Sequence, residues 1–463
     1  MESMEEKKSA KGRIVFIGRI RNLSPLHIGC GSDDRSDLDV LRDENGKPFI
    51  PATSFTGILK HAIESSANSD YKKYSKYAKK FWGFSEDKDG HQSIFRCADL
   101  VCQKNFQEQN IVIRDGIRID NRAGMVRDKG KYDYEIVEPG TAFDLKMEFA
   151  YERTEPDKKE EEFVRRMVGT IHFLLKNRHI QLGAKTNSGL GEIKLLENKT
   201  KVYEFDFSDK KDVIRWLTRS FSQAKSASLG TSFEINHRLF TIKAKFRLKN
   251  SLIIRSYSED PEMPDAVHIK SLDKPVLTGT SLKGAIRARA ERIVRTIGKS
   301  ESIITNLFGN VDDENRSQNA QKGRIQIRES VLSDFISELQ TRIKIDRFTS
   351  GTIETALFDT MPLWSEHDKI VNIEICVQKY KDYEAGLLLL ILKDLWTGDL
   401  AVGGEKNVGR GVFQGVKAII QCNNNEPIII ENDLNKLDHE IKATLQDYVK
   451  ALTHYRHDEK SND

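Results

Sequence analysis

Apolar and polar residues alternate along two stretches that occupy similar positions in the two halves of the chain. The first is RIVFIGRIRNLSPLHIG at 13–29, and the second is LFTIKAKFRLKNSLII at 239–254. Alternation of this kind is typical of a β-strand with one buried face. Each stretch therefore predicts a strand near the start of its half.

The same landmarks follow each predicted strand in the same order. A polar loop containing aspartate comes first, and a small-residue turn that opens a helix follows it. Next come a short aromatic segment, a strand, a charged loop, a further strand, and a long helix that ends at a glycine-rich loop. The paired sequences are KPFIPATSFTGILKHAIE (47–64) with KPVLTGTSLKGAIRARAE (274–291), KFWGF (80–84) with NLFGN (306–310), SIFRCADLV (93–101) with RIQIRESVL (324–332), and GAKTNSGLGEI (183–193) with GGEKNVGRGVF (403–413). Landmarks repeated in a fixed order predict a duplicated domain.

The repeat defines the predicted domains. We place a first module at 10–200, a connector with a predicted helix at 201–237, a second module at 238–425, and a C-terminal helix and tail at 426–463. The connector contains SQAKSASLGTS, which is small and polar like a flexible linker. Because strands flank two helices in each module, we expect an α+β fold with a ferredoxin-like βαββαβ core.

Composition limits the class of protein. The chain has 463 residues, of which 38% are hydrophobic and 31% charged, and it has no apolar run long enough to span a membrane. The N-terminus lacks the apolar core of a signal peptide, and five scattered cysteines fit a reducing cytoplasm better than a disulfide framework. The net charge is only +4, but basic residues gather in 114–131 and 281–300, where they could contact phosphate. We therefore expect a cytoplasmic protein.

The ordered landmarks resemble the RAMP superfamily of CRISPR-associated proteins, specifically the backbone subunits of type III effectors. The tandem arrangement resembles a fusion of two RAMP modules found in subtype III-D. The matching pieces are HIG (27–29), VLRDENGKPFIPATSFTG (40–57), GAKTNSGLG (183–191), DAVHI (265–269), KPVLTGTSLKG (274–284), LFG (307–309), KIDRFTSG (344–351) and GGEKNVGRG (403–411).

The resemblance implies a modified RNA-recognition-motif core with an inserted thumb-like hairpin in each module. It also implies binding of a CRISPR guide RNA and metal-dependent cutting of target RNA. The implied partners are guide RNA, target RNA, other RAMP subunits and the large polymerase-like subunit of a type III effector, with no membrane.

Two aspartates are the candidate catalytic and metal-binding residues. Alignment with the family selects Asp37, three residues before VLRD, with Asp39 as the nearest competitor. Asp265 falls at the equivalent place in the second module, with Asp260 as the alternative. A loop carboxylate can act as general base towards a 2′-hydroxyl, or can bind Mg²⁺ or Mn²⁺ through oxygen. The structural alternative is a solvated acidic turn.

Basic residues, small residues and glycines of the turns, glycine-rich loops and hairpins are the candidate RNA contacts. Unpaired amides at a helix N-terminus favour phosphate, and glycine lets a backbone approach closely. The alternatives are an ordinary helix cap, a structural turn and a hairpin covering the core edge. On the resemblance, apolar residues in the hairpins could wedge between base pairs of the guide–target duplex. The candidates are Ser54, Lys60, Arg122, Arg127, Lys185, Gly189, Gly191, Thr280, Ser281, Lys283, Arg287, Arg347, Lys406, Gly409, Arg410 and Gly411.

Histidine and cysteine residues suggest two further possibilities. His268, close to Asp265, could assist in acid–base chemistry or could be a packed strand residue. His91, Cys97 and Cys102 invite a zinc interpretation, but their spacing contains no Cys-x-x-Cys pair, so strand and edge positions are favoured.

Three other functions remain open from the sequence. The chain could be a guide-binding scaffold or capping subunit that does not cut RNA. It could be a stand-alone endoribonuclease that processes guide RNA without metal. It could also be a protein-interaction scaffold that binds no RNA.

Overall fold

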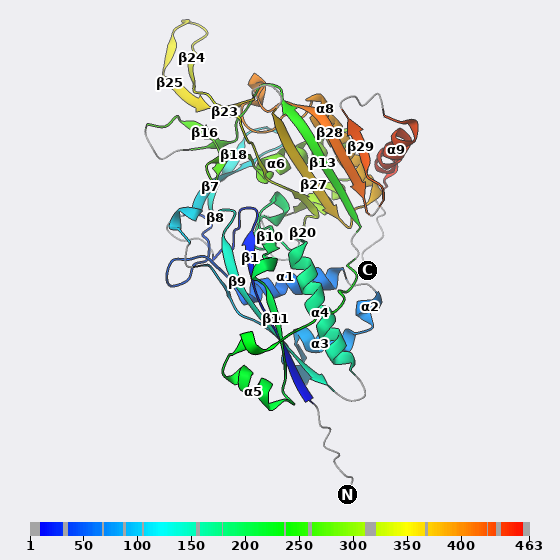
Figure 1. Cartoon of the computed structure of the whole chain (residues 1–463). Helices are drawn as coiled ribbons and strands as arrows, with labels where there is room; N and C mark the ends of the chain where they lie inside the picture. The colour runs from blue at the N-terminus through cyan, green and yellow to red at the C-terminus, as the bar shows by residue number, and fades with distance from the viewer. Residues whose placement is uncertain are drawn as a thin grey trace. The chain divides into compact units, whose positions relative to one another are not determined.

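The chain divides into two compact units (Figure 1). The first contains residues 1–113, 135–184 and 191–236, and the second contains 114–134, 185–190 and 237–463. Two segments of the first sequence module therefore pack with the second module. The computed structural model describes residues 10–30, 36–66, 69–86, 89–103, 106–153, 158–177, 179–235, 238–257, 262–310, 321–365, 369–423, 425–431 and 437–456.

An antiparallel sheet forms the centre of the first unit. Its strand order is β12-β11-β1-β9-β5, and β10 also pairs with β1. Strand β1 thus lies between β9, the third strand of the βαββαβ repeat, and β10 with β11, which take the place of the fourth, as in a ferredoxin-like fold. The strands are β1 (Ala10–Asn22), β5 (Phe95–Cys97), β9 (Ala142–Arg153), β10 (Ile193–Leu195), β11 (Lys201–Asp206) and β12 (Lys225–Ser226).

Helices of the first unit bury apolar side chains against this sheet. On α4, Phe163, Met167, Ile171 and Leu174 follow helical spacing and are all nearly inaccessible to solvent. Their burial is the main source of stability for this layer. The helices are α1 (Ala52–Ser65), α2 (Ser69–Lys72), α3 (Ser75–Trp82), α4 (Lys159–Lys176) and α5 (Lys210–Leu217), and two short strand pairs are β2 (Phe49–Ile50) with β6 (Leu100–Val101) and β3 (Phe84–Glu86) with β4 (Asp89–His91).

The connector between the two sequence modules packs against the first unit. Strand β12 pairs with β11, and Gly230 lies so close to α4 that a Cβ on Gly169 would come 2.0 Å from its carbonyl oxygen. Phe233 is 3% exposed, and its backbone N–H donates to Thr170 Oγ1 at 2.9 Å. The small residues of this segment serve close packing against α4 rather than flexibility.

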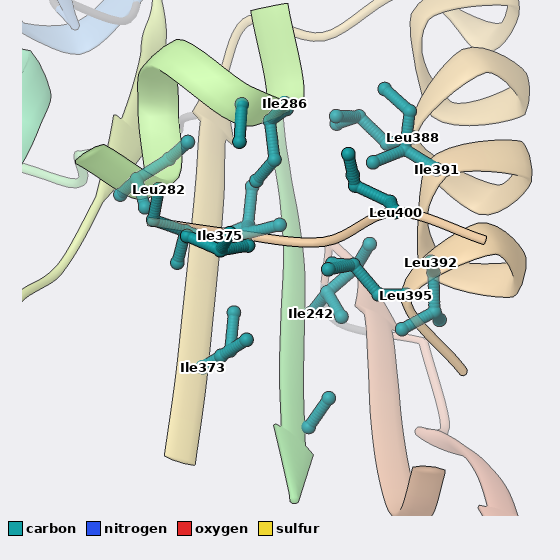
Figure 2. Packing of buried hydrophobic residues seen from close by; sticks show 14 of the residues in the cluster. Ile242, Leu282, Ile286, Ile373, Ile375, Leu388, Ile391, Leu392, Leu395 and Leu400 are labelled. Atoms are coloured by element: carbon teal, nitrogen blue, oxygen red, sulfur yellow. The ribbon is translucent and has the colours of Figure 1, made fainter. Parts of the chain in front are cut away.

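The second unit repeats the same topology around β13. Its sheet order is β21-β27-β13-β28-β29, so β13 again lies between the third and fourth strands of the repeat. Figure 2 shows the apolar layer in which Ile242 of β13 and Ile375 of β27 face Ile286 of α6 and Leu395 of α8. The elements are β13 (Leu239–Leu248), β21 (Ile325–Ile327), β27 (Ile370–Gln378), β28 (Phe413–Cys422), β29 (Ile428–Glu431), α6 (Gly279–Thr296), α7 (Ser302–Phe308), α8 (Asp382–Thr397) and α9 (His439–His454).

Both predicted thumb-like segments are hairpins. The first is β7 (Ile111–Ile119) with β8 (Val126–Val137), and the second is β24 (Gln340–Ile345) with β25 (Thr352–Met361). The prediction of two α+β, ferredoxin-like modules with inserted hairpins is confirmed. Short strands complete the second unit: β14 (Ser251–Leu252), β15 (Arg255–Ser256), β16 (Ala266–His268), β17 (Lys270–Ser271), β18 (Lys274–Leu277), β19 (Gly309–Asn310), β20 (Gln321–Lys322), β22 (Ser330–Val331), β23 (Ile336–Ser337) and β26 (Leu363–Trp364).

Within the described ranges, no helix is both long and apolar enough to cross a membrane.

Candidate nucleic-acid interface

Backbone hydrogen bonds align the two acidic turns residue by residue. Leu41 N–H donates to Ile28 O in the first module, and Ile269 N–H donates to Ile254 O in the second. Asp37 and Asp265 each lie four residues before these donors. The two candidate aspartates therefore occupy equivalent positions.

The first acidic turn presents one aspartate and buries another. Asp37 is exposed, whereas Asp39 is 2% exposed and accepts a 2.5 Å hydrogen bond from Ser36 Oγ. The second oxygen of Asp39 is buried and has no hydrogen-bond partner in the described part of the chain. Of these two residues, Asp37 is the one whose position allows contact with a polynucleotide. Asp33 and Asp34 lie outside the described residues.

A buried ion pair supports the first acidic turn. Both carboxylate oxygens of Glu135 accept hydrogen bonds from Arg42 at 2.8 Å, and one also accepts the Val40 N–H at 2.9 Å. The Glu135 hydrogen bond raises the pKa of Arg42 above its usual value. Glu135 N–H also donates to Leu38 O at 2.9 Å. The turn is thus fixed to the end of strand β8 through Glu135, a residue that the sequence did not single out.

The second acidic turn is fixed to its hairpin in a different way. Asp265 is exposed, and its carboxylate accepts the backbone N–H of Asp359 on β25 at 2.9 Å. Strands β16 and β25 pair in parallel directly after it. The carboxylate of Asp265 is therefore already engaged with the backbone of the hairpin. Asp260, the alternative, lies outside the described residues.

His268 is a packed residue. It is 3% exposed, its Nδ1 accepts the Ile254 N–H at 3.2 Å, and its Nε2 lies 2.9 Å from the Val276 carbonyl oxygen. Burial lowers its pKa to about 4. Because both ring nitrogens are engaged with backbone, the geometry favours the structural alternative over acid–base chemistry.

Metal binding by protein groups alone finds no support in the described ranges, where no cluster of three or more His, Cys, Asp or Glu could hold an ion. Mg²⁺ commonly uses one or two carboxylates together with substrate phosphates. An exposed aspartate such as Asp37 fits a metal shared with RNA. The zinc interpretation gains nothing, because His91, Cys97 and Cys102 form no such cluster in the described ranges.

A cluster of cations lies at the start of α6. Burial lowers the pKa of Lys283 to about 8, and repulsion from Arg287 and Lys185 contributes in the same direction. Lys185 Nζ donates to the Tyr132 hydroxyl at 3.0 Å and lies 4.1 Å from the centre of the Tyr134 ring. Lys185 belongs to the first sequence module, and Lys283 and Arg287 belong to the second. Together the three side chains concentrate positive charge at the start of α6. Arg287 also pairs with Glu291 at 2.9 Å.

The helix that carries Lys283 has a side-chain cap. Thr278 Oγ1 accepts the Ser281 N–H at 3.4 Å, and the Thr280 hydroxyl lies 3.2 Å from the same oxygen. This arrangement confirms the N-cap alternative without removing the charge beside it. In the first module, the Ala52 N–H at the equivalent helix start donates to Asp99 at 2.7 Å.

A carboxylate at a helix N-terminus occupies the place that phosphate would take. Ser54 is exposed nearby, and Lys60 is half-buried nearly two helical turns further on. The geometry therefore favours phosphate contact at α6 over contact at α1.

The two glycine-rich loops share one backbone conformation. Lys185 and Glu405 both have φ of 55°, and Gly189 and Gly409 both have φ of 85°. A Cβ on Gly191 would come 1.9 Å from Leu182 O, and one on Gly411 would come 1.8 Å from Val402 O. These last two glycines are required for packing within their own loops.

Charged residues of the second loop differ in their availability. Arg410 is 2% exposed and donates to Ser251 Oγ at 2.7 Å, Gln340 Oε1 at 2.5 Å and Glu405 Oε2 at 2.8 Å. These internal bonds favour a structural role for Arg410 over a phosphate contact. Lys406 lies on the exposed turn.

The hairpin tips are equivalent and carry the remaining candidates. Asp120 accepts the N–H groups of Arg122 and Ala123, and Asp346 accepts those of Phe348 and Thr349. Side chains around both tips are exposed, including Arg122, Arg127 and Arg347. Phe348 is 97% exposed and Met125 is 68% exposed. Apolar side chains that face solvent at a hairpin tip are typical of a contact surface.

Comparison with known proteins identifies the family. The family model of the RAMP superfamily matches residues 19–194 and 245–414, which together cover more than half of the chain and include one segment from each module. No curated protein matches the chain. The chain therefore belongs to the RAMP superfamily as two modules in tandem, which makes it a CRISPR-associated RNA-binding subunit.

Proposed function

We propose that this chain is a guide-RNA-binding backbone subunit of a type III CRISPR effector and that it cuts target RNA with a divalent metal. The observation that carries the proposal is the placement of Asp37 and Asp265. Both are exposed, occupy equivalent turns, and stand where the turn is hydrogen-bonded to the base of a projecting hairpin. The proposed setting is cytoplasmic, beside other RAMP subunits and the large polymerase-like subunit.

The chemistry follows from the position of the carboxylates. When the 2′-hydroxyl of RNA attacks the neighbouring phosphorus, a 2′,3′-cyclic phosphate forms and the bond to the 5′-oxygen breaks. The step needs a base for the 2′-hydroxyl, stabilisation of the charge on phosphate, and a proton from water or a cation for the leaving 5′-oxygen. In the second unit, the hairpin residue Phe348 would splay the bound strand and bring a phosphate to the acidic turn at Asp265. Asp37 or Asp265 would accept the proton or hold Mg²⁺ or Mn²⁺, which would supply positive charge at the phosphate.

RNA binding would use the cation cluster at α6. Lys185, Lys283 and Arg287 bring positive charge to the amides of a helix N-terminus, which suits phosphate without regard to base sequence. Base pairing with the guide would then supply specificity. Arg122, Arg127, Arg347 and Lys406 are exposed and would add further phosphate contacts.

The test is cleavage of target RNA by a reconstituted effector complex carrying Asp37→Ala, Asp265→Ala or both. We expect loss of cutting at the positions served by the altered module, with guide RNA still bound. Asp447→Ala on the exposed face of α9 is the matched control. Equal cutting by all variants would refute the catalytic role and leave a guide-binding scaffold.

One observation favours a non-catalytic second module. The Asp265 carboxylate already accepts the Asp359 backbone N–H at 2.9 Å, which occupies one of its oxygens within the protein. If only Asp37→Ala abolishes cutting, the second module binds guide without cutting. A chelator separates both cases from metal-free processing of guide RNA, which would continue in its presence.

A further inference from the structure

The two glycine-rich loops differ in what covers them. In the first loop Ser188 is 9% exposed, whereas Val408 at the equivalent place in the second loop is 55% exposed. A Cβ on Gly189 would come 2.6 Å from the Ile327 carbonyl oxygen, whereas the nearest atom of the described residues to a Cβ on Gly409 would be Asn250 Nδ2 at 3.7 Å. The second loop therefore has the backbone conformation of the docked first loop, and among the described residues no comparable surface covers it.

The first loop shows how such docking works. Asn187 Nδ2 donates to Gly323 O at 2.8 Å, and the loop passes so close to α6 that a Cβ on Gly279 would come 2.1 Å from Ser188 O. Glycine at the first position of the receiving helix is thus a steric condition for docking. The second loop retains the docking asparagine as Asn407.

The associated hairpin adds polar contacts to the same surface. Arg114 pairs with Glu329 at 2.6 Å, and Asn121 Nδ2 donates to Glu291 Oε2 at 2.8 Å. Each of these acids has an equivalent in the first module, one just before helix α1 in space and one within it.

Strand register identifies the equivalents. Ile50 pairs with Leu100 before α1, and Leu277 pairs with Ser330 before α6. This register aligns Ala52 with Gly279 and Asp99 with Glu329, and the helices that follow align Glu64 with Glu291. Arg347 corresponds to Asn121 in the hairpin tip, so a second copy docking here would bring Arg347 towards Glu64. The opposite charges of Arg347 and Glu64 therefore favour docking of a second copy of this chain on α1. The methyl group of Ala52 opposes that docking sterically.

We propose that loop 405–410 docks on the first helix of a RAMP-like module in a different protein, and that this helix begins with glycine as α6 does. Ala52 keeps a second copy of this chain from taking that place, because its Cβ would meet the Val408 carbonyl oxygen. The inference deepens the proposed assembly with other RAMP subunits, and it does not depend on RNA cleavage.

Sedimentation of the RNA-free full chain tests the inference. The variant Ala52→Gly/Val408→Asp serves as the surrogate partner. Its Ala52→Gly substitution lets α1 receive the loop of another chain, and its Val408→Asp substitution prevents its own loop from docking. We expect the wild-type chain to be monomeric on its own and to form a one-to-one complex with this variant. Val408→Asp alone, which retains Ala52, should not bind wild-type chain.

Two further variants complete the design. Ala52→Gly alone should self-associate with rising concentration, whereas Ala62→Gly, the same exchange later in α1, should not. Failure of the Ala52→Gly chains to associate would overturn the proposed role of Ala52, and wild-type self-association through Val408 would overturn the exclusion of a second copy. Loss of RNA cutting with these associations intact would count only against the proposed nuclease.

Discussion

Replacing Lys283 by methionine should stabilise the free protein and weaken its binding to RNA. Burial and two neighbouring cations lower the pKa of this lysine from 10.5 to about 8. At pH 7 Lys283 is charged in both states. In the unfolded chain its charge is fully solvated, whereas in the folded chain the charge is partly buried beside two other cations. The charge therefore lowers the free energy of unfolding. A pKa difference of this size corresponds to about 3 kcal/mol, at 1.36 kcal/mol per unit.

The pH dependence fixes the sign of the effect. Between about pH 8 and 10.5 the unfolded state binds more protons at Lys283 than the folded state does. The free energy of unfolding of the wild-type chain should therefore rise with pH across this window, and this rise should be smaller in Lys283→Met. Below pH 8 the methionine variant should be the more stable of the two, by up to about 3 kcal/mol.

Urea unfolding at pH 7 and pH 9 measures the first effect, and RNA binding at several salt concentrations measures the second. If Lys283 contacts one phosphate, the slope of log affinity against log salt should shrink by about 0.7. Lys274→Met, at an exposed position on β18, is the control for loss of a distant charge. A variant that loses stability and keeps its RNA affinity would refute the reasoning, because the lysine would then be a structural residue.

The remaining predictions concern burial and exposure at other points. Arg114→Ala should destabilise the chain by about 3–5 kcal/mol because Glu329 is left buried and unpaired, while Arg114→Met/Glu329→Met should cost much less in urea unfolding; equal losses would contradict this. The free energy of unfolding should fall as pH drops from about 6.5 to about 4, because His268 stays neutral in the fold, and His268→Asn should reduce that dependence. Phe348→Ser should change stability by less than about 0.5 kcal/mol, because the ring is 97% exposed, yet should reduce target cutting if the ring displaces a nucleotide.

Order and periodicity in the sequence were sufficient to predict the architecture. The alternation at 239–254 places Phe240, Ile242 and Phe246 on one face, and the structure buries those side chains in β13 and leaves Lys243 and Lys245 outside. The duplicated order of landmarks predicts the same strand order in both sheets. These features depend on local pattern and on repetition, which are visible without coordinates.

Features that depend on contacts between distant residues could not be predicted. Arg42 belongs to the VLRD motif but Glu135 lies far from it in the chain, and nothing in the sequence indicates that the two side chains together hold the first acidic turn. The composition of 222–232 indicates flexibility, but small side chains there also permit close packing on α4. Arg410 has the appearance of a phosphate ligand in sequence, whereas its bonds to Ser251, Gln340 and Glu405 appear only in three dimensions.

The division into units does not follow the division of the repeat, because residues 114–134 and 185–190 of the first repeat pack with the second. A cut near residue 237 would separate the two repeats in sequence but would remove part of the second unit. The C-terminal half would lose Arg114, and Glu329 would be left without its ion-pair partner. Expression of the two halves as separate polypeptides should therefore yield a C-terminal half that is less stable than the same residues in the whole chain. Covalent fusion of the modules thus ensures that each second module folds together with the segments that complete it.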